Sequence, residues 1–219
     1  MPVFVRDDKS VLFIHIPKTG GSSLERNLAD IGWRELFSIR GLPADQLTFL
    51  KATPQHFHAD LTEQIFNFEE FSAVVALVRD PFNRLKSEFY WQFRKAASWP
   101  DPIDWIDGVL AEAEGNPFLF DNHIRPQVDF FPNGVDVTTF KLEEDGVQQA
   151  QLFICGGEEE RPKGLKDRFL KGKSKRMKSS TYRPEIETSF AERRQAITEF
   201  YSADYARFGY RPDGLVERP

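Results

Sequence analysis

The chain has 219 residues, which is enough to bury one sizeable hydrophobic core, and we expect a single domain over residues 1–219. Hydrophobic residues make up 40% and charged residues 29% of the sequence, a composition that excludes an intrinsically disordered protein. The net charge of −5 argues against a general nucleic-acid binder, because such proteins are usually basic. A local basic site for one anionic ligand is still compatible with this total.

Cysteine usage and the lack of long apolar runs indicate the compartment. The only cysteine is Cys155, so no intramolecular disulfide can form, which fits a reducing environment. The first residues lack the basic start and apolar core of a signal peptide. No apolar run approaches the roughly 20 residues that span a bilayer. We therefore expect a cytoplasmic protein without a transmembrane segment.

The first predicted elements are a strand, a loop with two glycines and a helix. Residues Val11 to Ile16 are apolar and β-branched and end at Pro17, which predicts a strand buried in a parallel sheet. Apolar residues at helical spacing then predict a helix from Ser22 to Ile31.

The later elements alternate in the same way. Residues Ala73 to Val78 predict a second buried strand, and a helix is expected to begin at Pro81, since proline suits the first turn. Val137 to Leu142 predicts a third strand and Pro184 to Tyr205 a terminal helix. This order predicts an α/β fold with a central parallel sheet flanked by helices, in which ligands bind at the carboxyl ends of the strands.

The loop after the first strand has the residue types that bind a phosphate-like group. Glycines let the backbone turn tightly near a ligand, and the free amides that open the following helix favour an anion. Lys18 adds a positive charge, and it precedes the glycines, so the loop is not a Walker A motif. A tight turn without a ligand is the alternative. The candidate residues are Pro17, Lys18, Thr19, Gly20, Gly21, Ser22 and Ser23.

A second cationic group follows the second strand. Arg79 leaves that strand at the ligand-binding edge, and Arg84 and Ser87 lie three residues apart on one face of the following helix. A guanidinium and a hydroxyl that converge there suit a second, separate phosphate. The alternative is an ion pair between Arg79 and Asp80 at the start of the helix.

These two motifs resemble those of a known enzyme family. Residues Phe13 to Ser23 resemble the 5′-phosphosulfate loop of the carbohydrate-type sulfotransferases, and residues Val78 to Ser87 resemble the family's 3′-phosphate motif. The segments His123 to Gln127 and Tyr205 to Tyr210 also look like family landmarks. The resemblance implies a fold related to the P-loop nucleotide kinases. It also implies transfer of a sulfuryl group from 3′-phosphoadenosine 5′-phosphosulfate (PAPS) to an acceptor hydroxyl, with 3′-phosphoadenosine 5′-phosphate (PAP) as product.

The resemblance also implies residue roles in donor binding. Lys18 would contact the 5′-phosphate and the bridging oxygen, and Thr19 to Ser23 would hold the 5′ end. Arg79 and Ser87 would hold the 3′-phosphate. A sulfuryl group has less charge than a phosphoryl group, and the sequence shows no cluster with metal-ligand spacing, so we expect no metal requirement.

The proton of the acceptor hydroxyl needs a base, and histidine is the side chain best matched to that task near neutrality. His15 lies within a predicted strand and is expected to be structural. Gln55-His56 resembles the dipeptide that contains the base in related sulfotransferases, which favours His56. His58 would face the same side if the segment were extended, so it stays an alternative. His123, Arg125 and Gln127 are candidates for the acceptor side, with local loop hydrogen bonds as the alternative.

A basic run lies late in the chain, with one acidic residue, Asp167. The run is either a solvated surface, a loop that closes over the donor, for which Lys173 to Tyr182 is the candidate, or an attractant for an anionic acceptor. Its eight basic residues are Lys163, Lys166, Arg168, Lys171, Lys173, Lys175, Arg176 and Lys178.

The sequence therefore predicts a cytoplasmic sulfotransferase that acts on a hydroxyl of a saccharide or glycolipid, with no nucleic-acid partner. One alternative is a small-molecule kinase with an unusual phosphate loop, which would depend on ATP and magnesium. The other is a non-catalytic nucleotide- or glycan-binding module. The sequence fixes neither the acceptor nor the oligomeric state.

Overall fold

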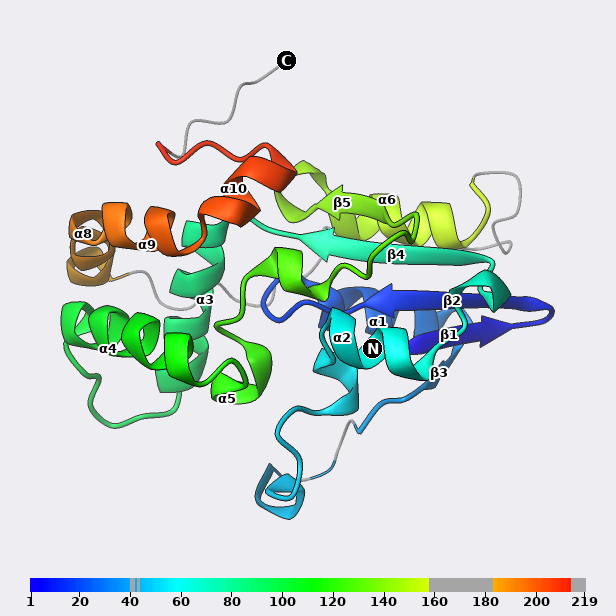
Figure 1. Ribbon diagram of the computed structural model, residues 1–219, viewed down its shortest axis with the longest axis horizontal. Helices are drawn as coiled ribbons and strands as arrows, with labels where there is room; N and C mark the ends of the chain where they lie inside the picture. The colour runs from blue at the N-terminus through cyan, green and yellow to red at the C-terminus, as the bar shows by residue number, and fades with distance from the viewer. Residues whose placement is uncertain (40–41, 43, 158–182, 214–219) are drawn as a thin grey trace.

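The computed structural model describes residues 1–39, 42, 44–157 and 183–213, which form an α/β fold around a five-stranded sheet (Figure 1). The strand order is β3-β1-β2-β4-β5. Strands β2, β4 and β5 pair in parallel, whereas β1 is antiparallel to both β2 and β3, so β1 alone runs in the opposite direction. The strands are β1 (Val3–Arg6), β2 (Lys9–Ile14), β3 (Arg34–Leu36), β4 (Ala73–Val78) and β5 (Thr138–Lys141).

The three predicted strands are present, and the N-terminal hairpin was not predicted. The register runs from Val11 opposite Ala73 to Ile14 opposite Ala76, which aligns the carboxyl ends of β2 and β4. The hairpin of β1 and β2 turns at Asp7, whose φ is 55°. The predicted parallel centre of the sheet is confirmed, with the antiparallel hairpin and β3 added at one side.

Alternation along the strands divides the sheet into two buried faces. On one face, Phe13 and Leu77 pack with residues of helices α1 (Gly21–Asp30) and α6 (Gly146–Ile154). On the other face, Ile14 and Val78 pack with aromatic side chains that include Phe130 and Phe131. Each face is therefore covered, as the apolar character of β2 and β4 requires.

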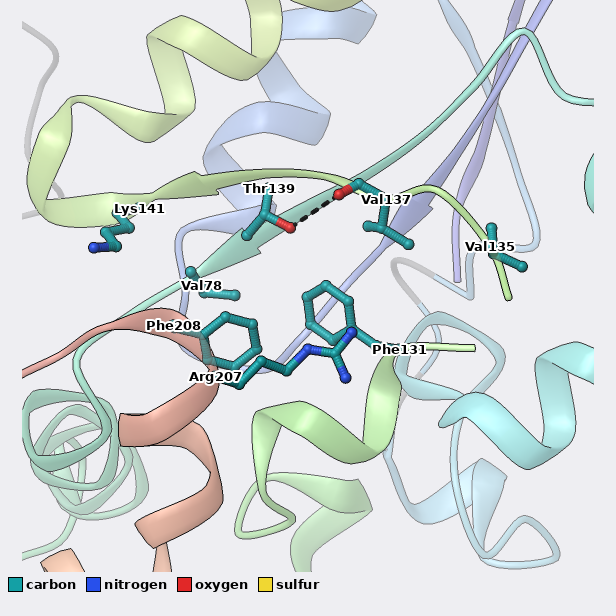
Figure 2. A pocket seen from close by; sticks show the side chains of 8 residues that line it. All are labelled: Val78, Phe131, Val135, Val137, Thr139, Lys141, Arg207 and Phe208. Atoms are coloured by element: carbon teal, nitrogen blue, oxygen red, sulfur yellow. Dashed lines mark hydrogen bonds between the residues drawn. The ribbon is translucent and has the colours of Figure 1, made fainter. Parts of the chain in front are cut away.

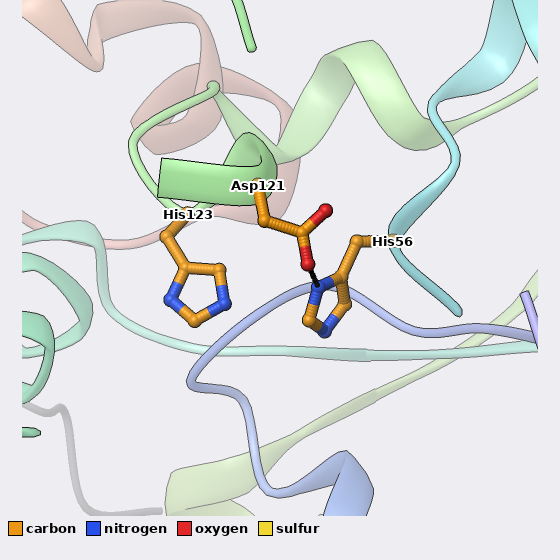
Figure 3. Close-up of side chains that lie close together, drawn as sticks. All are labelled: His56, Asp121 and His123. Carbon is orange, nitrogen blue, oxygen red and sulfur yellow. Dashed lines mark hydrogen bonds and ion pairs between the residues drawn. The ribbon is translucent and has the colours of Figure 1, made fainter. Parts of the chain in front are cut away.

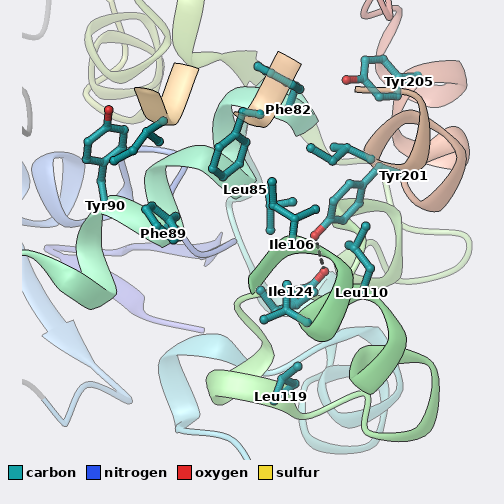
Figure 4. Packing of buried hydrophobic residues seen from close by; sticks show 14 residues of the cluster. Phe82, Leu85, Phe89, Tyr90, Ile106, Leu110, Leu119, Ile124, Tyr201 and Tyr205 are labelled. Atoms are coloured by element: carbon teal, nitrogen blue, oxygen red, sulfur yellow. Dashed lines mark hydrogen bonds between the residues drawn. The ribbon is translucent and has the colours of Figure 1, made fainter. Parts of the chain in front are cut away.

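A second helical layer lies beyond the carboxyl ends of β2, β4 and β5, at the left of Figure 1. Helix α4 packs against α8, and α3 packs against α9. Their shared core includes Leu85, Phe89, Ile106, Phe190 and Tyr201 (Figure 4). The helices are α3 (Pro81–Phe93), α4 (Pro102–Gly115), α8 (Pro184–Glu192) and α9 (Arg194–Phe200).

The predicted terminal helix is divided into α8, α9 and α10 (Ser202–Phe208). The backbone leaves helical geometry at Arg193 (φ −97°, ψ 8°) and at Tyr201 (φ −99°, ψ 23°). Tyr201 is buried at the second break, and its hydroxyl donates to the carbonyl of Ile124 at 2.8 Å. Tertiary packing thus overrides the helical periodicity at the second break.

Short helical segments connect the larger elements. Helix α3 begins at Pro81 as predicted, with the Asp80 carboxylate accepting the N–H of Asn83 at 2.9 Å. Within the described residues, no helix is both long and apolar enough to cross a membrane. The short segments are η1 (Ala44–Leu47), η2 (Pro54–His56), α2 (Ala59–Ile65), η3 (Phe68–Glu70), α5 (Leu119–Asn122), η4 (Gln127–Phe130) and η5 (Leu142–Glu144).

Candidate active site

The glycine loop follows β2 and opens α1 in the way that an anion site requires. Lys18 and Gly20 both have left-handed backbones, with φ of 69° and 99°. Gly20 caps α1, and its carbonyl accepts the N–H of Ser23 at 2.9 Å. Thr19 is buried, and its hydroxyl donates to the Ile16 carbonyl at 2.8 Å, so Thr19 helps to hold the loop itself. Ser22 is exposed and Ser23 half-buried, so both hydroxyls lie nearer to solvent than Thr19 does.

Gly21 is required because His15 packs directly beneath the loop. A Cβ atom at Gly21 would lie 2.4 Å from Nε2 of His15, far inside normal contact. His15 is buried, and its Nδ1 lies 2.5 Å from Oε1 of Glu25 on α1. His15 therefore supports the loop from within the fold, which agrees with the structural role expected for it.

Lys18 has a partly desolvated amine. Its Nζ lies 4.9 Å from the centre of the Trp91 ring. Burial lowers the pKa of Lys18 to about 8, against the opposing attraction of Glu88. An amine with this pKa is still mostly charged at neutral pH, and its positive charge is poorly screened, which strengthens its interaction with an anion.

Arg79 connects the second loop to the first. Its Nη1 donates to the Lys18 carbonyl at 3.1 Å, so the two predicted phosphate-binding segments are in direct contact. The buried Gln127 side chain fixes the backbone of Arg79, accepting its N–H at 2.9 Å and donating to its carbonyl at 2.8 Å. Gln127 in turn donates to Asp204 of α10. Ser87 lies on α3, half-buried.

Arg84 does not lie at the donor-binding edge, where the sequence predicted it. Its side chain is 1% exposed, and it donates to the carbonyl oxygens of His123 and Arg125, at 3.2 and 2.5 Å. The expectation that Arg84 and Ser87 converge on a second phosphate is therefore wrong for Arg84. The guanidinium instead satisfies two backbone acceptors in the loop after α5, a structural role.

His56 is buried and lies beside the half-buried side chains of Asp121 and His123 (Figure 3). Its Nδ1 is 2.8 Å from Oδ2 of Asp121, whose carboxylate also accepts the backbone N–H and the hydroxyl of Thr53, at 2.5 and 2.8 Å. Burial lowers the pKa of His56 to about 3, although the hydrogen bond to Asp121 opposes the shift. A neutral His56 that donates from Nδ1 to a carboxylate has Nε2 left as an acceptor, which is the state a general base needs.

Three imidazoles stand in a row at this site. The ring centres of His15 and His56 are 5.0 Å apart, and those of His56 and His123 are also 5.0 Å apart. Each Nδ1 has its own carboxylate, with distances of 2.5 Å to Glu25, 2.8 Å to Asp121 and 2.7 Å to Glu88. The row extends from beneath the glycine loop to Trp91, whose ring centre is 5.4 Å from that of His123.

The structure places the other predicted acceptor-side residues in different surroundings. His58 caps α2 and packs against the Phe118 ring at 5.4 Å, whereas His56 pairs with Asp121, so the two imidazoles have different partners although Phe57 and His58 are extended. Arg125 donates from Nε to Oδ1 of Asn122 at 3.0 Å. Gln127 is buried and bonded to Arg79 and Asp204, as described above, and this favours a structural role. Acceptor binding by His58, His123 and Arg125 stays a prediction.

A model of the family described as "Sulfotransferase family" matches residues 1–211. The chain belongs to the sulfotransferase family. Searches of curated proteins and of solved structures found no match. The family match favours the sulfotransferase interpretation over the kinase and the non-catalytic module. The single domain over residues 1–219 stays a prediction.

Membership of the sulfotransferase family implies PAPS as donor, and the two loops suit such a ligand. One loop offers helix-opening amides, Lys18 and the hydroxyls of Ser22 and Ser23, and the other offers Arg79 and Ser87. Hydrogen bonding between Arg79 and Lys18 sets the two loops side by side, as one ligand with a phosphate at each end requires. The basic run from Lys163 to Lys178 and the candidate closing loop from Lys173 to Tyr182 lie outside the described residues.

The structure of this sulfotransferase brings together a possible metal-ligand set that the sequence did not reveal. Potential ligand atoms of His56, Asp121 and His123 all lie within 4.8 Å of one another. In the described structure, Asp121 already accepts hydrogen bonds from His56 and Thr53, and His123 pairs with Glu88. These contacts suit proton chemistry, and metal independence stays a prediction.

One hollow in the described part of the chain lies away from this group. It has a volume of about 320 Å³ and lies between β5 and α10, beside the carboxyl end of β4 (Figure 2). None of the candidate site residues lines it. Its lining is Val78, Phe131, Val135, Val137, Thr139, Lys141, Arg207 and Phe208.

Sequence reasoning missed several residues of the site. Asp121 and Glu88 pair with imidazoles that lie 65 and 35 residues away in the chain, so no local spacing could reveal the contacts. Trp91 was also missed. It is 42% exposed beside Lys18 and His123, and its position on α3 could have been derived from the predicted helix. A period of 3.6 would have placed Trp91 one turn beyond Ser87.

Proposed function

We propose that this enzyme transfers the sulfuryl group of PAPS to a hydroxyl of a saccharide or glycolipid, with Lys18 and His56 as the catalytic residues. The observation that carries the proposal is the contact chain from the donor loop to the base. Lys18 contacts Trp91, Trp91 contacts His123, and His123 contacts His56. Lys18 and His56 are thus joined by three successive contacts, and a donor held by Lys18 and an acceptor held near His56 would meet along them.

The proposed reaction follows from the charges that develop. The acceptor oxygen forms a bond to sulfur while the bond from sulfur to the bridging oxygen of the 5′-phosphate breaks. Nε2 of His56 takes the acceptor proton, and PAP leaves with the bonding electron pair. Lys18 stabilises the negative charge on the leaving oxygen, in a site where low solvent exposure strengthens the interaction. Arg79 and Ser87 hold the 3′-phosphate.

A thermal-shift comparison tests the donor. PAP should raise the melting temperature, because a ligand that binds only the folded state adds about 2.7 kcal/mol of stability at 100 times its Kd. Adenosine 5′-phosphate, which lacks the 3′-phosphate, should give a smaller shift. In the variant Ser87→Ala, the melting-temperature shifts caused by PAP and by adenosine 5′-phosphate should be more nearly equal. A clear shift with ATP and magnesium and none with PAP would contradict the proposal.

Trp91 supports a saccharide acceptor. It is 42% exposed and contacts both Lys18 and His123, and an exposed indole offers a flat apolar surface to the C–H face of a sugar ring. Arg94 stacks on the same ring, with its Cζ 4.2 Å from the ring centre. The single cysteine, Cys155, supports our further proposal that the enzyme works in the cytoplasm.

Replacing Trp91 tests this acceptor surface. We expect Trp91→Ala to raise the KM for a saccharide acceptor by about tenfold, since losing an aromatic contact of this kind removes roughly 0.5–1.5 kcal/mol beyond the buried area. Trp91→Phe should retain most of the affinity. Initial-rate kinetics at saturating PAPS measure both values. An unchanged acceptor KM in Trp91→Ala would remove Trp91 from the acceptor site.

A further inference from the structure

Three consecutive non-glycine residues have left-handed backbones next to the candidate base. The φ angles of Phe120, Asp121 and Asn122 are 50°, 60° and 65°. Side chains disfavour this region, so a run of three such residues persists only where the surrounding contacts hold it. Strain of this kind is a reason to look for a function that the conformation serves.

The contacts of this segment converge on His56. The Asp121 carboxylate meets Nδ1 of the His56 ring at 2.8 Å, and the Asn122 amide donates to the His56 carbonyl at 2.8 Å. The segment therefore holds both the side chain and the backbone of the same residue. Arg125 fixes Asn122 from the other side, through Nε and Oδ1 at 3.0 Å.

The Asp121 carboxylate is itself fixed by a second segment. The backbone N–H and the hydroxyl of Thr53 donate to its two oxygens, at 2.5 and 2.8 Å. Because both oxygens are held, the carboxylate has one orientation, and in that orientation it accepts the hydrogen bond from Nδ1–H of His56. This arrangement selects the tautomer in which Nε2 carries no proton.

We propose that Asp121 is a positioning residue, held by the left-handed segment 120–122 so that its carboxylate fixes the orientation and the tautomer of the His56 ring. This inference rests on the proposed function, in which His56 accepts the proton of the acceptor hydroxyl. A solely structural role is the competing explanation, in which Asp121 only caps the turn at Thr53.

The variant Asp121→Asn separates these explanations. Asparagine tolerates the left-handed backbone and still offers an oxygen to Thr53, so a structural role would be retained. Its amide would donate to Nδ1 of His56, which moves the ring proton to Nε2 and blocks the base. We expect kcat to fall about 100-fold or more, with the Kd for PAP unchanged within twofold.

Nitrogen-15 NMR of the imidazoles provides a readout that does not depend on turnover. The chain has four histidines, and the difference from a His56→Gln sample assigns the His56 signals. We expect a protonated Nδ1 and an unprotonated Nε2 in the wild-type protein, and the reverse in Asp121→Asn. Asp107→Asn is the matched control, because Asp107 is a carboxylate on α4 that accepts from Arg193 at 2.8 Å. It should change neither the tautomer nor kcat.

The outcomes are distinguishable. An unchanged His56 tautomer together with an unchanged kcat in Asp121→Asn would overturn the positioning role. A reversed tautomer with unchanged kcat would retain the positioning of the ring and contradict His56 as base, and so the proposed function. If Asp121→Asn folds poorly, Asp121→Gly removes the carboxylate while glycine adopts the same backbone without strain. That variant should show mixed tautomers and the same loss of kcat if Asp121 positions His56.

Discussion

Replacing His56 with glutamine should lower kcat by about 10²- to 10⁴-fold, the range by which a positioned proton acceptor accelerates a reaction. Glutamine is similar in size and can still donate to the Asp121 carboxylate, but it has no nitrogen that accepts a proton near neutral pH. The loss should therefore appear in kcat, because the glycine loop and Arg79 are untouched. Single-turnover assays with bound PAPS measure the chemical step directly.

The matched control for this variant is His58→Gln. His58 packs against Phe118, apart from the row of imidazoles, so its replacement should leave kcat within a few-fold of wild type. The Kd for PAP should stay unchanged in both variants. If His58→Gln lost turnover and His56→Gln retained it, the base would have to be assigned to His58.

Replacing Lys18 with methionine should lower kcat by about 10²- to 10³-fold, as losing one preorganised donor to a developing oxyanion does. Methionine keeps the length and the apolar stem that lies beside Trp91, and it removes only the charge. Donor affinity should also weaken, since Lys18 would contact the 5′-phosphate in the bound state. Rapid-quench measurement of PAP formation separates the two effects.

The pH dependence of the wild-type enzyme gives a second test of Lys18. Burial lowers the pKa of its amine from 10.5 to about 8, so the charged form prevails below pH 8 and is lost above it. The value of kcat/KM for PAPS reports the free enzyme and should therefore fall as pH rises through about 8. In Lys18→Arg, whose guanidinium stays charged, this alkaline decline should disappear. If kcat/KM of Lys18→Arg still fell above pH 8 as in the wild type, the titrating group would have to be another residue.

Much of the fold could be predicted because the signals are local. The apolar runs of β2 and β4 are continuous, and Pro81 marks the start of α3. The strands β1 and β3 were missed because they form by antiparallel pairing beside β2, and the terminal helix was drawn too long because the break at Tyr201 arises from packing. Local pattern predicts an element well where its own residues determine it, and poorly where a distant contact does.

The same distinction applies to the site. The glycine loop and the Arg79 segment could be recognised because each is a contiguous motif after a strand. Arg84 was misplaced because the helical period gives its neighbours but not which side of α3 faces the donor. Asp121 could not be found, since its role depends on a left-handed backbone and on contact with Thr53, 68 residues away.

One chain of hydrogen bonds connects helix α10 to the glycine loop. Asp204 on α10 accepts from Gln127, Gln127 brackets the backbone of Arg79, and Arg79 donates to the carbonyl of Lys18. If donor binding tightens Arg79 through these bonds, it also favours the docked position of α10. Thermodynamic reciprocity then requires docking of α10 to raise donor affinity by the same factor. Donor affinity and the local stability of α10 would then be two measures of one coupling free energy.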